Sequence, residues 1–293
     1  MKLIKQSFEF INQTDFSLVG IKKHIERCAR VSYKSEDKIT DTSYEKFVNM
    51  LESRGHNRPL EFGTVYLTLR GDDTNALRNI FTYTENPWTK IRKQVIKAEY
   101  DPNTHVVLNY VTTNYRVIVE NHLEEDLKYL CEPTEYHYKR YTAHMVLDRG
   151  VMDEFRTHVG LSHLAESTRY CNYSKDKFDN EITFIKPCWL DDEKLKLYGP
   201  YHTVIRDKSP ESIFIANLNN VERDYLDLIK LGWTPQQARS ILPLGIKSEL
   251  ISCGFEDAWN NFFYRRDAPD AHPMAQEIAN PMHQKFIELT KIE

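Results

Sequence analysis

The stretch THVVLNYVTTNYRVIV, at residues 104–119, decides the fold class, because most of its residues are β-branched or aromatic. Residues of this kind fit a pleated sheet, so the stretch is predicted to be extended. A second strand is predicted at residues 64–70, where apolar residues alternate with others as on a half-buried strand. A third, shorter strand is predicted at residues 142–147. The chain is therefore predicted to contain a sheet rather than helices alone.

Helices are predicted between and after these strands. The clearest begins at Ser209-Pro210 and runs through Leu231, since serine can cap it, proline suits the first turn and Gly232 ends it. The other predicted helices cover residues 43–55, 72–100, 123–138, 152–166 and 234–243, and the stretch from Ile246 onward is predicted to be mostly helical. With no internal repeat, low-complexity tract or linker, this mixture predicts an α/β (α+β) fold in one compact domain over residues 1–293.

Composition sets limits on the function. The 293 residues carry a formal net charge of −4, which gives no reason to expect binding to a nucleic acid backbone, so any phosphate site must be a local group of arginines. No apolar run approaches membrane-spanning length, and the N-terminus lacks the apolar core of a signal peptide. The five cysteines are scattered singly and no zinc-ligand spacing occurs, so we expect reduced thiols, a cytoplasmic location and no metal site.

Residues 166–178, ESTRYCNYSKDKF, form the stretch with the most unusual composition. It holds several hydroxyl groups, two tyrosines, an arginine and two lysines, and it has almost nothing to bury. A solvated loop has this composition, and so does the wall of a pocket that binds a phosphate and a flat, hydrogen-bonding ring. Taken alone, the stretch leaves both interpretations open.

Three arginines are candidates for an anion site. Arg169 follows two hydroxyl-bearing residues, Arg239 lies in a predicted helix, and Arg266 follows an aromatic run. The surroundings of Arg239 and Arg266 are largely apolar in sequence, where a buried guanidinium must find a partner. For any one of the three, an internal salt bridge is the simplest interpretation. The three together with Ser167 favour a shared anionic ligand, because guanidinium groups suit phosphate and carbonyl oxygens.

The segment HVGLSHLAESTRY, at residues 158–170, resembles the signature of the flavin-dependent thymidylate synthases. That signature is Arg-His-Arg, two residues, Ser, four residues, Ser, one residue, Arg-Tyr. The matching positions are held by His158, Ser162, Ser167, Arg169 and Tyr170. Just upstream, Asp148-Arg149-Gly150 matches the common lead-in.

Other stretches resemble family segments in the same order along the chain. They are Ala29-Arg30-Val31-Ser32, Gly55-His56 through Thr64, Ala238 through Pro243, and Phe262 through Arg266 with His272-Pro273. The resemblance spans nearly the whole chain and is weakest over residues 72–100. It implies the thymidylate synthase-complementing type of fold, in which a mixed or antiparallel sheet is flanked by long helices.

The resemblance also implies an activity. This is the FAD-dependent methylation of deoxyuridine monophosphate (dUMP) to thymidine monophosphate, with methylenetetrahydrofolate as carbon donor and NADPH as reductant. Reduced flavin supplies a hydride in this route, so no protein nucleophile is required, and none of the five cysteines precedes a His as in the classical thymidylate synthases. Family members are homotetramers with sites between subunits. The implied partners are therefore dUMP, folate and further copies of the chain, without nucleic acid or membrane.

The resemblance implies a role for individual residues. Arg266 and Ser167 would be catalytic, with Arg266 stabilising negative charge that develops on the uracil. The implied substrate ligands are Glu154, Ser167, Arg169, Tyr170, Arg239 and Arg266. The implied cofactor ligands are Ser32, His56, Thr64, Arg156, His158 and Asn261.

Three departures fall in the flavin half of the family pattern. Thr157 and Val159 occupy the places of the two signature arginines, although Arg156 stands one residue earlier. Phe62 replaces the His that follows Glu61. The sequence therefore favours a divergent flavin-dependent thymidylate synthase and leaves two alternatives open. One is a related enzyme that installs another one-carbon group, such as hydroxymethyl, at the same uracil carbon; the other is a non-catalytic nucleotide-binding relative.

Overall fold

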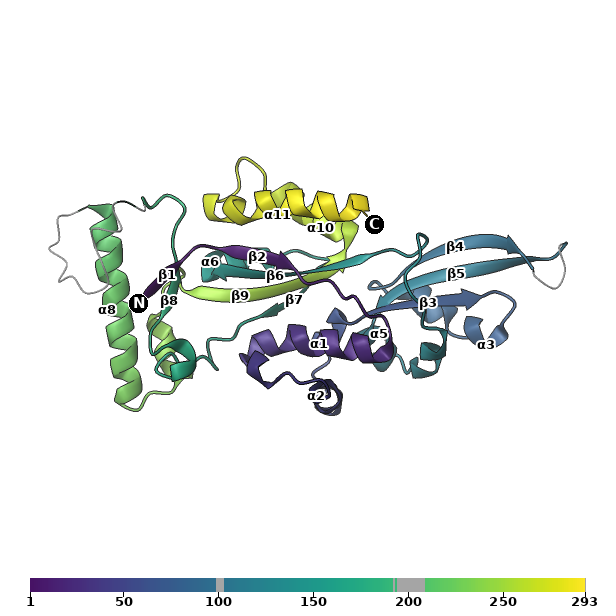
Figure 1. The fold of residues 1–293 in the computed structure, drawn as a ribbon, viewed down its shortest axis with the longest axis horizontal. Coiled ribbons are helices and arrows are strands. Elements are labelled where there is room, and N and C mark those ends of the chain that lie inside the picture. The colour runs from purple at the N-terminus through teal and green to yellow at the C-terminus, as the bar shows by residue number, and fades with distance from the viewer. Residues whose placement is uncertain (99–102, 192, 194–208, 293) are drawn as a thin grey trace.

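A four-stranded antiparallel sheet forms the centre of the molecule (Figure 1). The computed structural model describes residues 1–98, 103–191, 193 and 209–292. The strand order in this sheet is β2 (Ser7–Phe10), β6 (Arg140–Asp148), β9 (Lys247–Phe255) and β7 (Ser162–Ala165). β6 and β9 pair along their whole length, so these two strands form the rigid centre to which the other elements attach.

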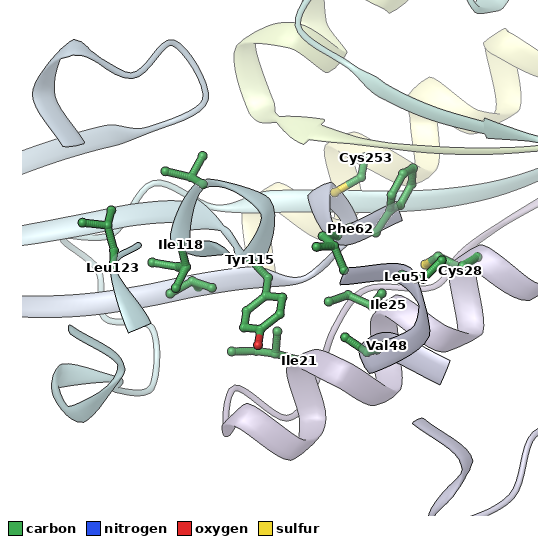
Figure 2. Close-up of a cluster of buried hydrophobic side chains, with 14 of the residues drawn as sticks. Ile21, Ile25, Cys28, Val48, Leu51, Phe62, Tyr115, Ile118, Leu123 and Cys253 are labelled. Carbon is green, nitrogen blue, oxygen red and sulfur yellow. The ribbon is translucent and has the colours of Figure 1, made fainter. Parts of the chain in front are cut away.

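Helices cover both faces of this central sheet (Figure 1). On one face lie α10 (Glu256–Arg266) and α11 (Pro273–Ile292), whose aromatic side chains pack with those of β6, β9 and α6 (Arg149–Phe155) in one buried cluster. On the other face lie α1 (Leu18–Tyr33) and α2 (Ser43–Ser53). Figure 2 shows the second cluster, in which apolar side chains of α1 and α2 meet Cys253 of β9.

A three-stranded antiparallel sheet extends from one end of the molecule (Figure 1). Its order is β3 (Thr64–Arg70), β5 (His105–Asn114) and β4 (Lys90–Lys97). The helices α3 (Thr74–Leu77), α4 (Ile80–Glu85) and α5 (Tyr115–Glu120) flank these strands in the chain.

At the opposite end, β1 (Lys2–Ile4) pairs in parallel with β8 (Thr183–Ile185), and α8 (Pro210–Lys230) leads into α9 (Pro235–Ala238). Short 3₁₀ helices fill the connections. They are η1 (Glu36–Lys38), η2 (Arg58–Phe62), η3 (Glu124–Tyr129), η4 (Asp176–Phe178) and η5 (Arg239–Ile241). No helix in the described ranges combines the length and the apolar character that crossing a membrane requires.

The α/β fold class with antiparallel sheets and flanking helices is confirmed. The predicted strand at residues 64–70 is β3, and the predicted helices at 43–55 and from Ser209 are α2 and α8. Both helices follow local signals that the sequence displays. The Ser209 side chain accepts a hydrogen bond from the Ser212 N–H, and Gly232 takes a left-handed φ of +99° just after α8.

Three strands were predicted as helix, and those predictions are wrong. β4 lies within the predicted helix at 72–100, where only α3 and α4 are helical. β7 lies within the predicted helix at 152–166, which ends at Phe155; Gly160, with a φ of +92°, turns the chain into the strand. β9 lies in the stretch predicted to be mostly helical from Ile246, and nearly all its residues are buried because the sheet is covered on both faces. A strand buried on both faces has no alternation to reveal it.

Two further predictions need correction. The extended stretch at 104–119 ends as a strand at Asn114, whose side chain accepts from the Val117 N–H and so starts α5. The predicted helix at 123–138 is only the 3₁₀ helix η3. The predicted strand at 142–147 is correct in place and shorter than β6.

Candidate functional site

A cleft of about 250 Å³ opens beside the end of β7, and we call it the arginine cleft. Its lining is polar and contains four arginines from separate parts of the chain. The lining residues are Ser32, Arg58, Arg149, Arg156, His163, Leu164, Ala165, Glu166, Ser167, Thr168 and Arg239. Such a concentration of guanidinium groups has the chemistry that suits an anion, in a chain whose overall charge is negative.

Separate elements bring these residues together. Ser32 lies in the last turn of α1, Arg58 begins η2, and Arg239 begins η5. Arg149 begins α6, because the Asp148 side chain caps the helix by accepting from the Val151 N–H. Arg156 follows seven residues after Arg149, and this spacing returns its side chain to the same face of the helix.

Most of the positive charge in the cleft is not neutralised by the protein. Asp153 Oδ2 lies 3.4 Å from Arg149 Nε, and Asp153 Oδ1 lies 3.4 Å from Arg156 Nη1, so one carboxylate serves two guanidinium groups. Arg239 Nη1 donates to Thr168 Oγ1 at 3.5 Å, at the limit of hydrogen bonding. Arg58 has no hydrogen bond or ion pair with any residue in the described ranges. An anionic ligand would supply the missing partners.

The hydroxyl of Ser32 also lacks a partner. Its Oγ is buried and makes no hydrogen bond with the described part of the protein. A buried polar group without a partner costs about 1–3 kcal/mol, so a ligand atom that reaches this hydroxyl would recover that free energy. The unpaired hydroxyl and the incompletely paired arginines lie in the same cleft, and phosphate oxygens can satisfy both.

A second, larger cavity of about 700 Å³ is lined by Glu154 and by residues 264–266 and 268–272. Arg266 is held firmly in its wall. Its Nη1 donates to Glu154 Oε2 at 2.8 Å, its Nη2 to the Glu154 main-chain oxygen at 3.0 Å, and its Nε to His158 Nε2 at 2.7 Å. Burial and the nearby charges of Arg266 and Arg265 lower the pKa of His158 to about 4, so the imidazole is neutral and can accept from Arg266.

The model of the family of thymidylate synthase complementing proteins matches residues 132–290, which is more than half of the chain. The chain belongs to this family. The matched range holds the signature-like segment, α6, Arg239 and Arg266, so the resemblance predicted from the sequence is confirmed.

Solved structures similar to this family member resemble it loosely. The UMP/dUMP methylase PolB from Streptomyces cacaoi, bound with 5-Br dUMP, aligns with a TM-score of 0.42 and 15% identity over 99% of this chain and 93% of its own. Thymidylate Synthase X from Helicobacter pylori, with FAD and dUMP, aligns with a TM-score of 0.35 and 17% identity over 49% of this chain and 65% of its own. No curated protein matches the sequence.

The structure brings together only part of the predicted substrate site. Ser167 and Arg239 line the arginine cleft, whereas Glu154 and Arg266 line the second cavity. Arg169 lines neither, and its guanidinium carbon lies 5.3 Å from the centre of the Tyr170 ring. The largely apolar neighbours of Arg239 in the sequence do not bury it, since its side chain is exposed.

Tyr170, another predicted substrate ligand, is also not enclosed by the surrounding protein. Its ring is 57% exposed and lies 6.3 Å from the ring of Tyr33. The hydroxyl of Tyr33 in turn bonds Nδ1 of His56 at 3.1 Å. These three side chains form an exposed aromatic surface beside the loop that follows β7.

The predicted cofactor ligands of this family member are scattered. Ser32 and Arg156 line the arginine cleft, and His158 contacts Arg266. Thr64 is buried, and its hydroxyl accepts from Arg140 Nη1 at 3.2 Å, while Asn261 is exposed on α10.

The residues of the arginine cleft fit one part of FAD and do not fit another. The arginine cleft suits the diphosphate of a dinucleotide, because it offers several guanidinium groups and the free hydroxyl of Ser32. Only Leu164 and Ala165 among its lining residues are apolar, and no Phe, Tyr or Trp of the described chain lines it. An isoalloxazine ring needs a flat apolar wall, which this cleft does not offer within one copy of the chain.

Two cleft arginines, Arg58 and Arg149, were not predicted as ligands. Both lie inside stretches that the family resemblance covers: Arg58 in the segment that begins at Gly55, and Arg149 in Asp148-Arg149-Gly150. The signal was therefore present, since Arg149 is itself part of the matched lead-in and Arg58 lies inside a matched segment. His163, which donates or accepts at Ser252 Oγ at 2.8 Å, was missed because its buried place depends on the pairing of β7 with β9.

Proposed function

We propose that this chain is a flavin-dependent enzyme that methylates dUMP at the uracil C5 carbon. Methylenetetrahydrofolate would give the carbon, and NADPH would reduce FAD. The observation that carries the proposal is that distant parts of the chain meet in one cleft. Ser32, Arg58, the end of the signature-like segment and Arg239 are far apart in sequence, belong to separate family-like stretches, and line one arginine cleft.

The arginine cleft would bind phosphate. A phosphate dianion accepts hydrogen bonds from several donors at once, and Arg239, Ser167 and Ser32 are donors without strong partners in the protein. Arg58, Arg149 and Arg156 add more positive charge than one phosphate monoester needs. We assign this excess to the diphosphate of FAD, which when bound would supply the hydride for the reaction.

Arg266 would stabilise negative charge that develops on the uracil. A guanidinium group has five N–H donors. Four of them are used by Glu154, His158 and Thr157 Oγ1, the last at 3.3 Å, which leaves one donor on Nη1. A donor that is fixed before the reaction needs no reorganisation when charge develops, and this is the most effective form of electrostatic stabilisation.

The enzyme would act as a homotetramer, with the flat wall for the flavin ring supplied by a second copy of the chain. The lack of an aromatic wall in the cleft lining of the described chain supports this part of the proposal. Light scattering should give the mass of four chains, and a monomer that binds FAD at full stoichiometry would contradict it.

The activity is tested by mass spectrometry of the nucleotide after incubation of the protein with dUMP, methylenetetrahydrofolate, NADPH and FAD. A parallel reaction lacks FAD. A methylated product that requires FAD supports the proposal. A hydroxymethylated product, or an unchanged nucleotide that nevertheless binds, would replace it by the related transferase or by the non-catalytic relative, respectively.

A matched pair of variants ties the activity to the cleft. Arg239→Met removes an exposed arginine of the cleft. Arg223→Met removes an arginine of α8 whose side chain is 64% exposed and pairs with its neighbour Asp224 at 2.9 Å. We expect the first to lose dUMP affinity by about tenfold and the second to match the unmodified protein.

A further inference from the structure

Four charged side chains form a group of ion pairs that reaches the arginine cleft at Glu166, and we call it the buried quartet. Its members are Lys34, Glu166, Lys247 and Glu249. At its edge, Lys34 Nζ also lies 3.7 Å from Glu36 Oε1. Lys247 Nζ lies 3.0 Å from Glu166 Oε2, and Lys34 Nζ lies 3.9 Å from Glu166 Oε1. Both lysines also contact Oε1 of Glu249. The two positive and two negative charges balance.

The quartet is shielded from water. The side chain of Glu166 is 2% exposed and that of Lys247 is 18% exposed. Burial alone would lower the pKa of Lys247, but the carboxylates of Glu166 and Glu249 outweigh it and raise that pKa. Burial would raise the pKa of Glu249, but the hydrogen bond from His144, together with both lysines, lowers it. The neighbouring charges therefore favour the charged forms of Lys247 and Glu249 in spite of their burial.

Glu166 connects the quartet with the arginine cleft. It is the one acidic residue among the described residues that line the cleft, and it immediately precedes Ser167. Without a counter-charge, its carboxylate would attract the cleft arginines and occupy the donors that a phosphate requires. Instead Lys247 holds its Oε2 and Cys171 Sγ donates to its Oε1 at 3.3 Å.

The backbone conformation of Lys34 indicates that its side chain matters at this position. Lys34 ends α1 in the left-handed conformation, with a φ of 48° and a ψ of 53°. This conformation costs a residue with a side chain about 1–2 kcal/mol, and glycine is the usual choice at such a position. A lysine here reaches both acids of the quartet, two residues after Ser32 of the cleft.

We propose that Lys247, assisted by Lys34, is a positioning residue for anion binding: it neutralises Glu166 so that the neighbouring arginines stay available for the phosphate of the substrate. This inference rests on the proposed function, in which the arginine cleft binds the phosphate of dUMP. The inference adds Lys247 to the site, a residue that lies outside every family-like stretch of the sequence and that would touch no ligand itself.

The test compares Lys247→Met, Glu166→Gln and the double variant that carries both changes. Binding of dUMP and of inorganic phosphate is measured separately by calorimetry, and folding is monitored by thermal unfolding. We expect Lys247→Met to weaken both affinities by about tenfold, since an unpaired carboxylate then competes for the arginines. The double variant, in which no unpaired charge is left at Glu166, should return to within about threefold of the unmodified protein.

Two controls separate electrostatics from general damage. Lys230→Met removes an exposed lysine of α8 that pairs with Asp227 at 3.0 Å, and it should leave both affinities unchanged. Glu166→Gln alone removes the one negative charge in the described cleft lining and leaves Lys34 and Lys247 with less counter-charge, so it should bind phosphate more tightly than the unmodified protein. This single variant keeps the inference testable even if Lys247→Met fails to fold.

The inference is overturned if Lys247→Met binds both anions normally, if the double variant stays as weak as Lys247→Met, or if a folded Glu166→Gln loses phosphate affinity. The proposed function can fail separately. Should the protein bind inorganic phosphate with the expected variant pattern but not dUMP, the role of Lys247 stands and the nucleotide assignment falls. Should it bind neither anion, both fall.

Discussion

Glu154 holds Arg266 through its side chain and its main chain together. The carboxylate Oε2 accepts from Nη1 at 2.8 Å, and the main-chain oxygen accepts from Nη2 at 3.0 Å. Because Glu154 lies on α6 and Arg266 ends α10, this pair links the two helices that border the second cavity. The sequence left open whether Arg266 forms an internal salt bridge or serves a ligand. The salt bridge exists, and we propose that it orients the guanidinium for its ligand.

The first prediction concerns this pair. Glu154→Gln keeps an oxygen acceptor for Arg266 but removes the negative charge, so we expect kcat to fall by about tenfold with a smaller change in the KM for dUMP. Arg266→Met should lower kcat by about 10²–10³-fold. Steady-state kinetics measure both. Glu256→Gln, at an exposed position of α10, is the control. A Glu154→Gln variant with normal kcat would show that Arg266 needs no orientation by charge.

The second prediction concerns Arg169 and Arg239, both of which the family resemblance assigned to the substrate, with loss of Arg169 expected to abolish nucleotide binding. Arg239 lines the arginine cleft, whereas Arg169 lies against the ring of Tyr170 outside it. We therefore expect Arg239→Met to weaken dUMP binding about tenfold and Arg169→Met to weaken it by less than about threefold. Equilibrium dialysis with labelled dUMP decides between them. A reversed order would mean that the loop after β7 moves when the nucleotide binds.

The comparison of α8 with β9 shows which parts of the fold the sequence can reveal. Both ends of α8 carry local signals, since Ser209 caps it and Gly232 ends it, and it was predicted almost to the residue. β9 pairs with β6, about a hundred residues earlier, and is buried on both faces. Nothing local marks such a strand, because its partners and its covering helices define it.

The candidate site likewise contains residues that the sequence could predict and an interaction that it could not. Ser167 and Arg239 were predicted because they occupy fixed positions in family-like segments, and the structure places both in the arginine cleft. The neutralisation of Glu166 by Lys247 could not be predicted, since it depends on the pairing of β7 with β9. The fold puts Glu166 one residue after β7 and Lys247 at the start of β9, and no motif contains both.

The third prediction is that the protein loses stability as the pH falls below about 6.5. Burial lowers the pKa of His24 to about 3, and it lowers the pKa values of His158 and His163 to about 4. In the unfolded chain the same side chains titrate near 6.5. Between those values the unfolded state binds more protons, so the free energy of unfolding is highest above pH 6.5 and decreases as the pH falls toward 4.

The size of this effect can be measured. Each histidine contributes a slope of about 1.4 kcal/mol per pH unit where only the unfolded state is protonated, so the three together give up to about 4 kcal/mol per pH unit. Urea unfolding at several pH values between 4.5 and 7.5 gives the slope. His24 lines neither cavity, and His24→Gln should reduce the slope by about one third. An unchanged slope would indicate that His24 is protonated in the folded state.

The fourth prediction is that one substitution at Ser32 raises the stability of the protein and weakens its binding of dUMP. The buried Oγ of Ser32 has no partner in the described protein, and the residue lies in the last turn of α1. Replacing it with alanine removes the unsatisfied group and improves helix propensity, so Ser32→Ala should raise the free energy of unfolding by about 1 kcal/mol. The same change removes a donor from the arginine cleft, so dUMP affinity should fall by about tenfold.

The matched control is Ser53→Ala, at an exposed serine of α2 whose hydroxyl donates to the Met50 main-chain oxygen at 3.1 Å. Thermal unfolding and calorimetry are measured on the same samples. If Ser32→Ala is destabilised, its hydroxyl has a partner inside the protein, and the cleft loses one of the two kinds of donor on which the phosphate assignment depends.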